Sequence, residues 1–304
     1  MSSLVWMAGI LTLACMLVFA PDSYLPMLLR AFLVQWTLLF LLSACLLLWK
    51  GSRQPAIATL MGSFLLCAHF PYTRSSAFIG SDGTGLRVLH MNVWQPNRDH
   101  EEVVQQALAS NAHLISVQEV DLNWARELTT GLQDRYPYSR IEARSDCYGI
   151  AMFSQLPIER FMTRSMDDTP FLEAHLRSDG RPIRFISIHA TSPISYGHFQ
   201  RRNRQLEGLA QHVAGCAIPT VVVGDLNTVP WDEAYERLCA EAGLHAPSAP
   251  VQRTWPSLGH IALIPLDHLL LSTGASARSI DTFTIPGSDH RGLLAEVILP
   301  PHAP

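Results

Sequence analysis

The sequence predicts a mixed α/β sandwich that is preceded by an apolar helical membrane anchor. Three observations support this fold class. Apolar residues are concentrated in the first quarter of the 304 residues, strand-like runs alternate with helical patterns directly after it, and later strand-like runs follow one another without a helix between them. Alternation favours parallel pairing and consecutive strands favour antiparallel pairing, so the sheets should be mixed.

The anchor is predicted from three apolar stretches at residues 4–20, 31–49 and 56–70, inside a first region of 73 residues that is almost free of charge. A helix needs about 20 apolar residues to cross about 30 Å of hydrocarbon, so we expect three transmembrane helices. A helical hairpin buried in a soluble core is the alternative. The stretches lack the polar face that such a hairpin would have, which favours lipid.

The loop with Lys50 and Arg53 is the most basic connection in this region, and the positive-inside rule places it in the cytoplasm. The first three residues contain no basic residue, so we expect no signal-peptide cleavage. After three crossings of a bacterial plasma membrane the rest of the chain would lie outside the cytoplasm, in the periplasm. After two crossings it would lie in the cytoplasm, so the compartment depends on the third helix.

A short polar linker at residues 74–85 is predicted to join the anchor to a soluble region at 86–304. From Ser81 to the end the chain has 18 Arg, no Lys and 25 Asp plus Glu, a net charge of −7. An acidic domain argues against sequence-indifferent binding of nucleic acid, although a local basic strip can coexist with net negative charge. Cys147, Cys216 and Cys239 show no zinc-like or redox spacing, so we expect buried free thiols.

The soluble region opens with a strand at 87–93 and a helix whose start is marked by Asp99 and Glu102, a pair that can form a capping box. A second strand at 114–117 and a second helix at 122–132 follow. The remaining strand-like runs lie at 148–153, 171–176, 183–188, 220–223, 266–271 and 293–299, and the remaining helical patterns at 198–213 and 231–242.

Most of these predicted strands end in a polar or acidic side chain. Strand ends flank the loops where binding and catalytic groups concentrate, so a repeated pattern of this kind predicts one converged site. Taken alone, each Asn or Asp is more often an ordinary turn residue and each His more often a structural group. The group comprises Asn92, Glu119, His189, Asp225, Asn227, Asp267, His268, Asp289 and His290.

The runs together resemble the endonuclease/exonuclease/phosphatase superfamily, the DNase I-like proteins. The matching segments occur in the family's order and cover Leu86 to Leu299. The resemblance implies a four-layer sandwich of two β-sheets flanked by helices. The segments are His90-Met91-Asn92-Val93, Val117-Gln118-Glu119-Val120, Tyr148 to Ser154 with Pro157-Ile158, Ile186 to His189, Val223 to Asn227, Leu266 to Leu269 and Ser288 to Arg291.

This resemblance implies a metal-dependent phosphoric ester hydrolase. Glu119 suits a hard cation such as Mg²⁺, with Mn²⁺ as a substitute, because carboxylate oxygens are its preferred ligands. Asn92 would help to hold the metal or the phosphate, and Asp289 would serve the metal directly or through water. Without such a partner the charge of Glu119 would lie at a costly position at the end of an apolar strand.

The resemblance also assigns catalytic roles. His290 would be the base or the partner of the transition state, with Asp267 fixing its tautomer. Asp225 and Asn227 would orient the water and the phosphate, and Asp225 could itself be the base, so both alternatives stay open. His189 would donate to the phosphate or the leaving group. Every position holds the expected residue type, which favours an active enzyme over an inactive binding or scaffold protein.

Membership of such a family determines the reaction more firmly than the substrate. The anchor, the acidic charge and the expected topology favour a lipid or lipid-linked cell-envelope phosphate, and the architecture resembles the membrane-anchored branch associated with teicoplanin resistance. A membrane-anchored nuclease is the alternative. The bilayer is the expected partner, and no obligate protein partner is inferred. Candidate substrate-binding residues are Arg201, Arg202, Arg204, Trp94, Tyr196 and Trp231, for which a solvated face or core packing is the competing interpretation.

Overall fold

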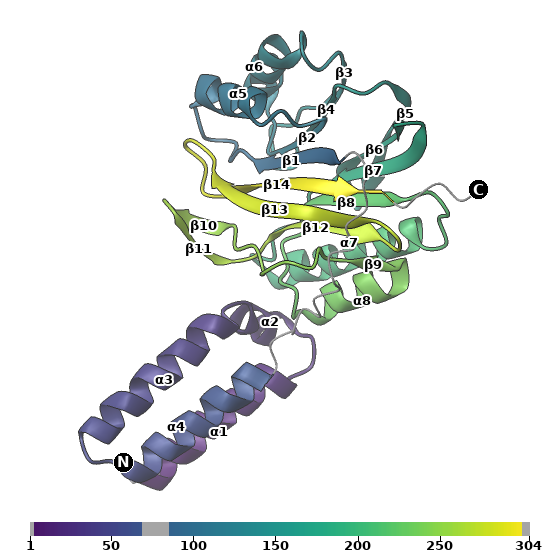
Figure 1. The fold of residues 1–304 in the computed structure, drawn as a ribbon. Coiled ribbons are helices and arrows are strands. Elements are labelled where there is room, and N and C mark those ends of the chain that lie inside the picture. Colours follow the sequence, from purple (N-terminus) through teal and green to yellow (C-terminus); the bar gives the residue numbers. More distant parts are fainter. Residues whose placement is uncertain (1–2, 69–84, 300–304) are drawn as a thin grey trace. The chain divides into compact units, whose positions relative to one another are not determined.

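A computed structural model of the chain describes residues 3–68 and 85–299 (Figure 1). The chain divides into two compact units, one made of Met1–Tyr72 with Val229–Glu236 and the other of Thr73–Thr228 with Arg237–Pro304. The predicted linker at 74–85 lies outside the described residues, apart from Gly85.

The first unit contains four helices: α1 (Ser3–Phe19), α2 (Tyr24–Ala31), α3 (Leu33–Trp49) and α4 (Arg53–Ala68). Three of them match the predicted apolar stretches, and α2 is additional. Small residues let α1, α3 and α4 approach closely. A Cβ atom at Gly62 would lie 2.9 Å from the ring of Phe40 and 3.4 Å from the Cβ of Ala14, so any larger residue there would require Phe40 to move.

These helices are shorter than the predicted spans. Within residues 3–68 and 85–299, no single helix is both long enough and apolar enough to cross a membrane; α1 and α2 meet that test only as a pair bent by 100°. The helix lengths therefore do not by themselves support three separate crossings. Large apolar side chains are nevertheless exposed along all four helices, among them Trp6, Phe19, Leu25, Leu42, Trp49 and Phe64.

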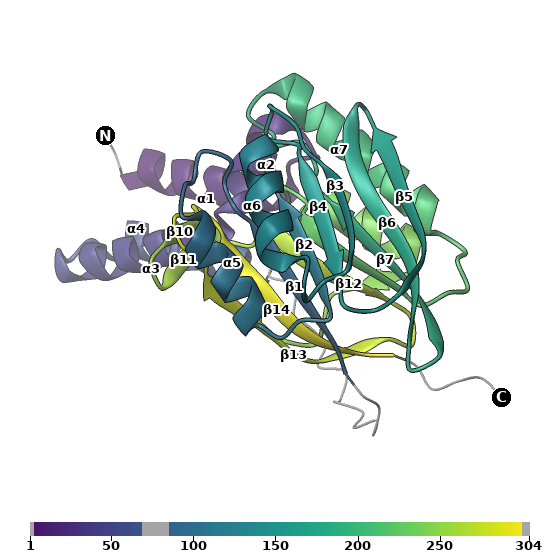
Figure 2. The ribbon, with the colours of Figure 1, turned by 90° about the horizontal axis from the view of Figure 1, so that it is seen from above.

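The second unit is built on two six-stranded sheets and a separate hairpin (Figures 1 and 2). The first sheet has the order β13 (Ser276–Thr284), β14 (Arg291–Ile298), β1 (Leu86–Asn92), β2 (Leu114–Gln118), β4 (Ile150–Ser154), β3 (Tyr138–Glu142). The second has the order β5 (Ile158–Met166), β6 (Thr169–Ser178), β7 (Arg181–Ile188), β8 (Thr220–Asp225), β12 (Asp267–Ser272), β9 (Leu244–His245). The hairpin pairs β10 (Trp255–Leu258) with β11 (Ile261–Ile264).

Both sheets are mixed, as the sequence predicts. The pairs β1/β2 and β7/β8 are parallel, and the other sheet pairs are antiparallel. The sequence pattern did not predict β3, β5, β9, β13 or the hairpin. Most of the missed strands are at sheet edges, where exposed charged residues interrupt the apolar pattern of a strand.

Helices complete the predicted four layers. α5 (His100–Ala109) and α6 (Leu122–Leu132) pack on the outer face of the first sheet through a buried cluster that includes Val103, Trp124 and Leu128. α7 (Tyr196–Val213) lies along the outer face of the second sheet (Figure 2), and α8 (Glu233–Ala242) follows β8.

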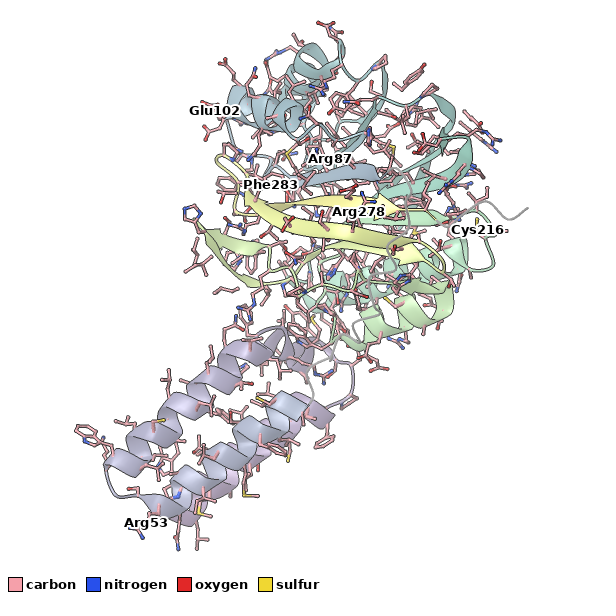
Figure 3. The ribbon with its side chains drawn as sticks, viewed as in Figure 1. Arg53, Arg87, Glu102, Cys216, Arg278 and Phe283 are labelled. Carbon is pink, nitrogen blue, oxygen red and sulfur yellow. The ribbon has the colours of Figure 1, made fainter. Side chains whose placement is uncertain are left out.

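Two local predictions need correction. Asp99 is the residue before α5, but its side chain makes no capping hydrogen bond; the cap that forms is on α6, where Asp121 accepts from the backbone N–H of Trp124 at 2.8 Å. The six cysteines are free, as expected, but none of Cys147, Cys216 and Cys239 is fully buried: Cys147 and Cys239 are partly exposed, and Cys216 is exposed in the loop after α7 (Figure 3).

The layer between the two sheets changes character along each strand. Alternate residues of β1 face this layer: Leu86 and Val88 belong to its apolar cluster, and His90 and Asn92 continue the same face as buried polar groups. On β8, Val221 and Val223 are followed in the same way by Asp225, and β2 and β7 repeat the pattern. The interior is therefore apolar at one end and polar at the end where the parallel strands finish.

Candidate active site

The polar ends of the central strands meet at one edge of the sandwich. β1 and β2 are parallel, as are β7 and β8, so each pair finishes on the same side. β12 and β14 run antiparallel to β8 and β1, so their first residues lie at this edge as well. The buried side chains collected there include Asn92, His189, Asp225, Asn227, Asp267 and His290.

Asp225 lies at the centre of the site. Its Oδ2 accepts a hydrogen bond from Asn92 Nδ2 at 3.2 Å and lies 3.6 Å from His189 Nε2 and 3.7 Å from His290 Nε2. Its Oδ1 accepts from the backbone N–H of Asn227 at 2.9 Å. Burial, together with the charge of Asp267, raises the pKa of Asp225 well above its usual range. A carboxylate with a raised pKa is a stronger base, once ionised, than an exposed carboxylate.

His290 is oriented by Asp267. His290 Nδ1 lies 2.8 Å from Asp267 Oδ2, which leaves Nε2 directed toward Asp225. Burial alone would lower the pKa of His290, but the charge of Asp267 and this hydrogen bond outweigh burial and raise the pKa to about 10. His290 is therefore an imidazolium at neutral pH. His189 differs, because burial and the nearby charge of His290 lower its pKa to about 4.

Glu119 is held in a strained position. Its φ of +64° lies in the left-handed region, which costs a non-glycine residue energy, and Trp94 and Asn227 at the same edge also have positive φ, at 58° and 49°. Glu119 Oε1 accepts from Asn92 Nδ2 at 3.1 Å and Oε2 from the backbone N–H of Gln95 at 2.9 Å. Burial is the main cause of the raised pKa of Glu119, and the charge of Asp289 adds to it.

These groups fit a divalent cation. Glu119 is a mostly buried carboxylate whose two donors, the Asn92 amide and the backbone N–H of Gln95, are both uncharged. Asp289 accepts from Trp255 Nε1 at 3.0 Å through Oδ2, and among the described residues its buried Oδ1 has no hydrogen-bond partner. A bound cation would account for the buried Asp289 oxygen that has no hydrogen-bond partner, and carboxylate oxygens are the ligands that a hard cation prefers.

A second grouping consists of Asp225, Asp267 and His290, whose ligand atoms lie within 4.8 Å of one another. Asp267 is less suited to a cation than this proximity suggests, because both its oxygens already accept hydrogen bonds from histidines. Asn92 also departs from its expected role. It directs its amide nitrogen toward Glu119 and Asp225, so it acts there as a hydrogen-bond donor and not as an oxygen ligand.

The sequence profile of the Endonuclease/Exonuclease/phosphatase family matches residues 89–290, which is more than half of the chain. The chain belongs to this family. It is accordingly a metal-dependent phosphoric ester hydrolase. No curated protein matches the sequence.

Solved structures of low sequence identity share the fold of this family member. Sphingomyelinase C from Streptomyces griseocarneus has 18% identity and a TM-score of 0.54, with 70% of this chain and 99% of that chain covered. D. rerio TDP2 complexed with single-strand DNA product has 12% identity and a TM-score of 0.58, with coverage of 70% and 99%. A Staphylococcus aureus beta toxin mutant with bound magnesium ions has 15% identity and a TM-score of 0.54, again with 70% and 99% covered.

Of the candidate substrate residues, Arg201 and Arg204 line a cavity of about 460 Å³ beside the candidate active site. The guanidinium carbon of Arg201 is 5.4 Å from the ring centre of Tyr148, which in turn is 5.6 Å from the ring of His189. The other lining residues are Arg144, Asp146, Asp167 and Asp168.

The other candidates lie elsewhere. Arg202 is fully buried, and its Nη1 donates to the carbonyl of Asn227 at 3.3 Å, so it supports the site from inside. Trp94 and Tyr196 are exposed, with 41% and 58% of their surface accessible. Trp231 is buried and belongs to the other unit.

Sequence analysis did not single out Gln118 or Gln95. Gln118 Oε1 accepts from the backbone N–H of Asp225 at 2.9 Å, and its side-chain nitrogen donates to the carbonyl of Ile188. Gln95 Nε2 donates to the carbonyls of Arg144 and Asp146. A usable signal was present for Gln118, because it is a polar residue at an inward-facing position of an apolar strand.

Proposed function

We propose that the chain is a membrane-anchored, Mg²⁺-dependent phosphodiesterase or phosphomonoesterase that hydrolyses a phosphate ester or pyrophosphate of a lipid or lipid-linked cell-envelope substrate. The observation that carries the reaction is the buried arrangement of His290, Asp267 and Asp225 beside Glu119, with a proton donor and a proton acceptor less than 4 Å apart.

Each side chain at the site has its own proposed role in the reaction. Asp225, with its raised pKa, takes a proton from the attacking water. His290, as an imidazolium, donates to a phosphoryl oxygen on which charge develops, and Asn227 and the neutral His189 add hydrogen bonds. We therefore favour Asp225 over His290 as the base.

Glu119 and Asp289 would hold the cation. When bound, Mg²⁺ supplies positive charge that neutralises the negative charge developing on the phosphoryl group. Two observations support Mg²⁺: the donors are carboxylate oxygens, and the beta toxin that shares the fold contains magnesium ions.

The lipid assignment rests on the first unit. Its helices expose large apolar side chains such as Phe19, Trp49 and Phe64, of which 70%, 83% and 76% is accessible. Soluble proteins rarely expose apolar surface on this scale, and a bilayer would cover it. The structural likeness to a sphingomyelinase is compatible with a lipid phosphodiester. We further propose that the second unit faces the periplasm, as the Lys50 and Arg53 loop predicts.

A nuclease is the second candidate. It is favoured by the cavity that Arg201 and Arg204 line, and by the likeness to TDP2, which was crystallised with a single-strand DNA product. The acidic charge of the soluble region argues against it.

The test uses the full chain in detergent with Mg²⁺, or with EDTA in its place. Substrates are bis(p-nitrophenyl) phosphate, a phospholipid panel, a polyprenyl diphosphate and plasmid DNA. Glu119→Ala removes the proposed metal ligand, and Glu127→Ala, an exposed glutamate on α6, is the matched control. We expect Mg²⁺-dependent hydrolysis of a lipid substrate that only Glu119→Ala abolishes. Cutting of DNA but not lipid would reverse the choice of substrate.

A further inference from the structure

A second histidine binds the carboxylate that orients His290. His90 on β1 is completely buried, and its Nε2 lies 2.8 Å from Asp267 Oδ1. The other oxygen of Asp267 is the one that His290 Nδ1 contacts. Asp267, at the start of β12 in the second sheet, therefore lies between two imidazoles from the first sheet, that of His90 on β1 and that of His290 directly before β14.

The hydrogen-bond partners of His90 indicate which ring nitrogen is protonated. An ionised carboxylate only accepts hydrogen bonds, so Nε2 of His90 has a proton. In the neutral ring Nδ1 has a lone pair, and this atom lies 3.3 Å from Ser116 Oγ. Ser116 Oγ in turn lies 2.6 Å from Ser187 Oγ. When Ser187 donates to Ser116 and Ser116 donates to His90, each hydrogen bond in this series is donated in the direction of Asp267.

These hydrogen bonds restrict rotation of the Asp267 carboxylate. Each carboxylate oxygen has one imidazole donor, so rotation of the carboxylate would break two hydrogen bonds inside a buried layer. Without the His90 bond, Oδ1 would be a buried acceptor with one partner fewer, and the carboxylate could rotate to share its remaining donor. The contact of His290 Nδ1 with Oδ2 would then lose its fixed direction, and so would the approach of Nε2 to Asp225.

We propose that His90, supported by Ser116 and Ser187, is a positioning residue that fixes Asp267 and thereby the tautomer and direction of His290. The proposal rests on the proposed function, in which His290 and Asp225 act on the substrate. It differs from a purely structural role, in which His90 would only tie β1 to β12 and its loss would affect stability without changing the reaction.

The experiment compares His90→Leu with His90→Gln in the full chain in detergent. The amide nitrogen of glutamine can reach the position of Nε2 and donate to Asp267, whereas leucine fills the space without donating. Steady-state hydrolysis of bis(p-nitrophenyl) phosphate with Mg²⁺ gives kcat and KM separately. His113→Gln, at the opposite end of the β1/β2 pair, is the matched control.

For His90→Leu we expect kcat to fall by about 10- to 100-fold with KM within about twofold, the effect typical of losing an outer-shell partner. His90→Gln should recover most of kcat, and His113→Gln should equal the wild type. Equal loss in the leucine and glutamine variants, or an unchanged kcat in a folded leucine variant, would overturn the proposal.

A second readout does not depend on turnover. In protein with ¹⁵N-labelled histidine, the Nδ1 proton of His290 should give a sharp low-field NMR signal that broadens in His90→Leu and returns in His90→Gln. If the wild type hydrolyses no phosphoester but this signal behaves as expected, the proposed function fails and the positioning role stands. If the leucine variant does not fold, the glutamine variant alone is the test. A glutamine variant that folds but lacks the sharp signal would contradict the proposal.

Discussion

The two ends of the layer between the sheets are built by the same strands, but one end stabilises the fold and the other holds the candidate active site. At one end, side chains such as Val88, Phe185 and Val223 form an apolar cluster that joins the sheets. At the other end, two residues further along β1 and β8, His90 and Asp225 take the same inward positions. Burial stabilises the fold at the first end and raises or lowers pKa values at the second.

The difference shows how one sandwich separates stability from chemistry. Burying apolar area is favourable, whereas burying charges costs free energy unless each has partners. The polar end meets this cost with a connected network, and the left-handed backbone of Glu119 adds strain there. We therefore expect substitutions at the polar end to change catalysis far more than stability, and substitutions at the apolar end to do the reverse.

The largest effect is expected at the polar end. Glu119→Ala and His290→Ala should each lower kcat/KM by about 10³-fold or more, because a metal ligand or a proton donor is lost. The midpoint of urea unfolding should change far less than kcat/KM does, since neither side chain belongs to the apolar cluster that joins the sheets. Near-normal turnover in either variant would contradict the site, and a large fall in stability would contradict the separation of the two ends.

At the apolar end, Phe185→Ala should destabilise the fold by about 4 kcal/mol, because a fully buried ring is replaced by a cavity. Urea unfolding followed by near-ultraviolet circular dichroism measures the loss. The protein that remains folded should retain the wild-type KM. A loss below about 1 kcal/mol would mean that the layer collapses around the cavity and is less tightly packed than the structure shows.

Asp267→Asn tests the electrostatics of the polar end. It removes the main influence that raises the pKa of His290 to about 10, so His290 should lose its proton at a lower pH. The alkaline limb of the kcat–pH profile should move down, and kcat should fall by about 10- to 100-fold. Asp281→Asn, an exposed substitution on β13, is the control. An alkaline limb at the wild-type position would show that His290 is not the group whose proton is required.

The smallest effect sharpens the comparison. Ile183→Val removes one buried methylene group at the apolar end and should cost about 1 kcal/mol, with kcat and KM unchanged. Urea unfolding and steady-state kinetics on the same preparation give both values. A clear change in kcat would show that packing at the apolar end reaches the catalytic groups.

Much of the fold follows from local patterns. The central strands and α6 were predicted within a few residues, because buried strands and an amphipathic helix have strong apolar periodicity. Edge strands such as β5 and β13 were missed, since one of their faces is open to water and their charged residues conceal the alternation. The predicted capping role of Asp99 failed because capping depends on a backbone geometry that residue type alone does not fix.

By itself the sequence determined which residue types stand at the strand ends, and their order along the chain identified the family before any distance was known. Only the tertiary structure decided how those residues divide their roles. In the structure the amide nitrogen of Asn92 donates to Glu119, and buried Arg202 donates to the carbonyl of Asn227. His90 of the first sheet contacts Asp267 of the second. The physical reason is that tautomers, pKa values and ligand directions depend on neighbours across the sandwich, here 177 residues away along the chain.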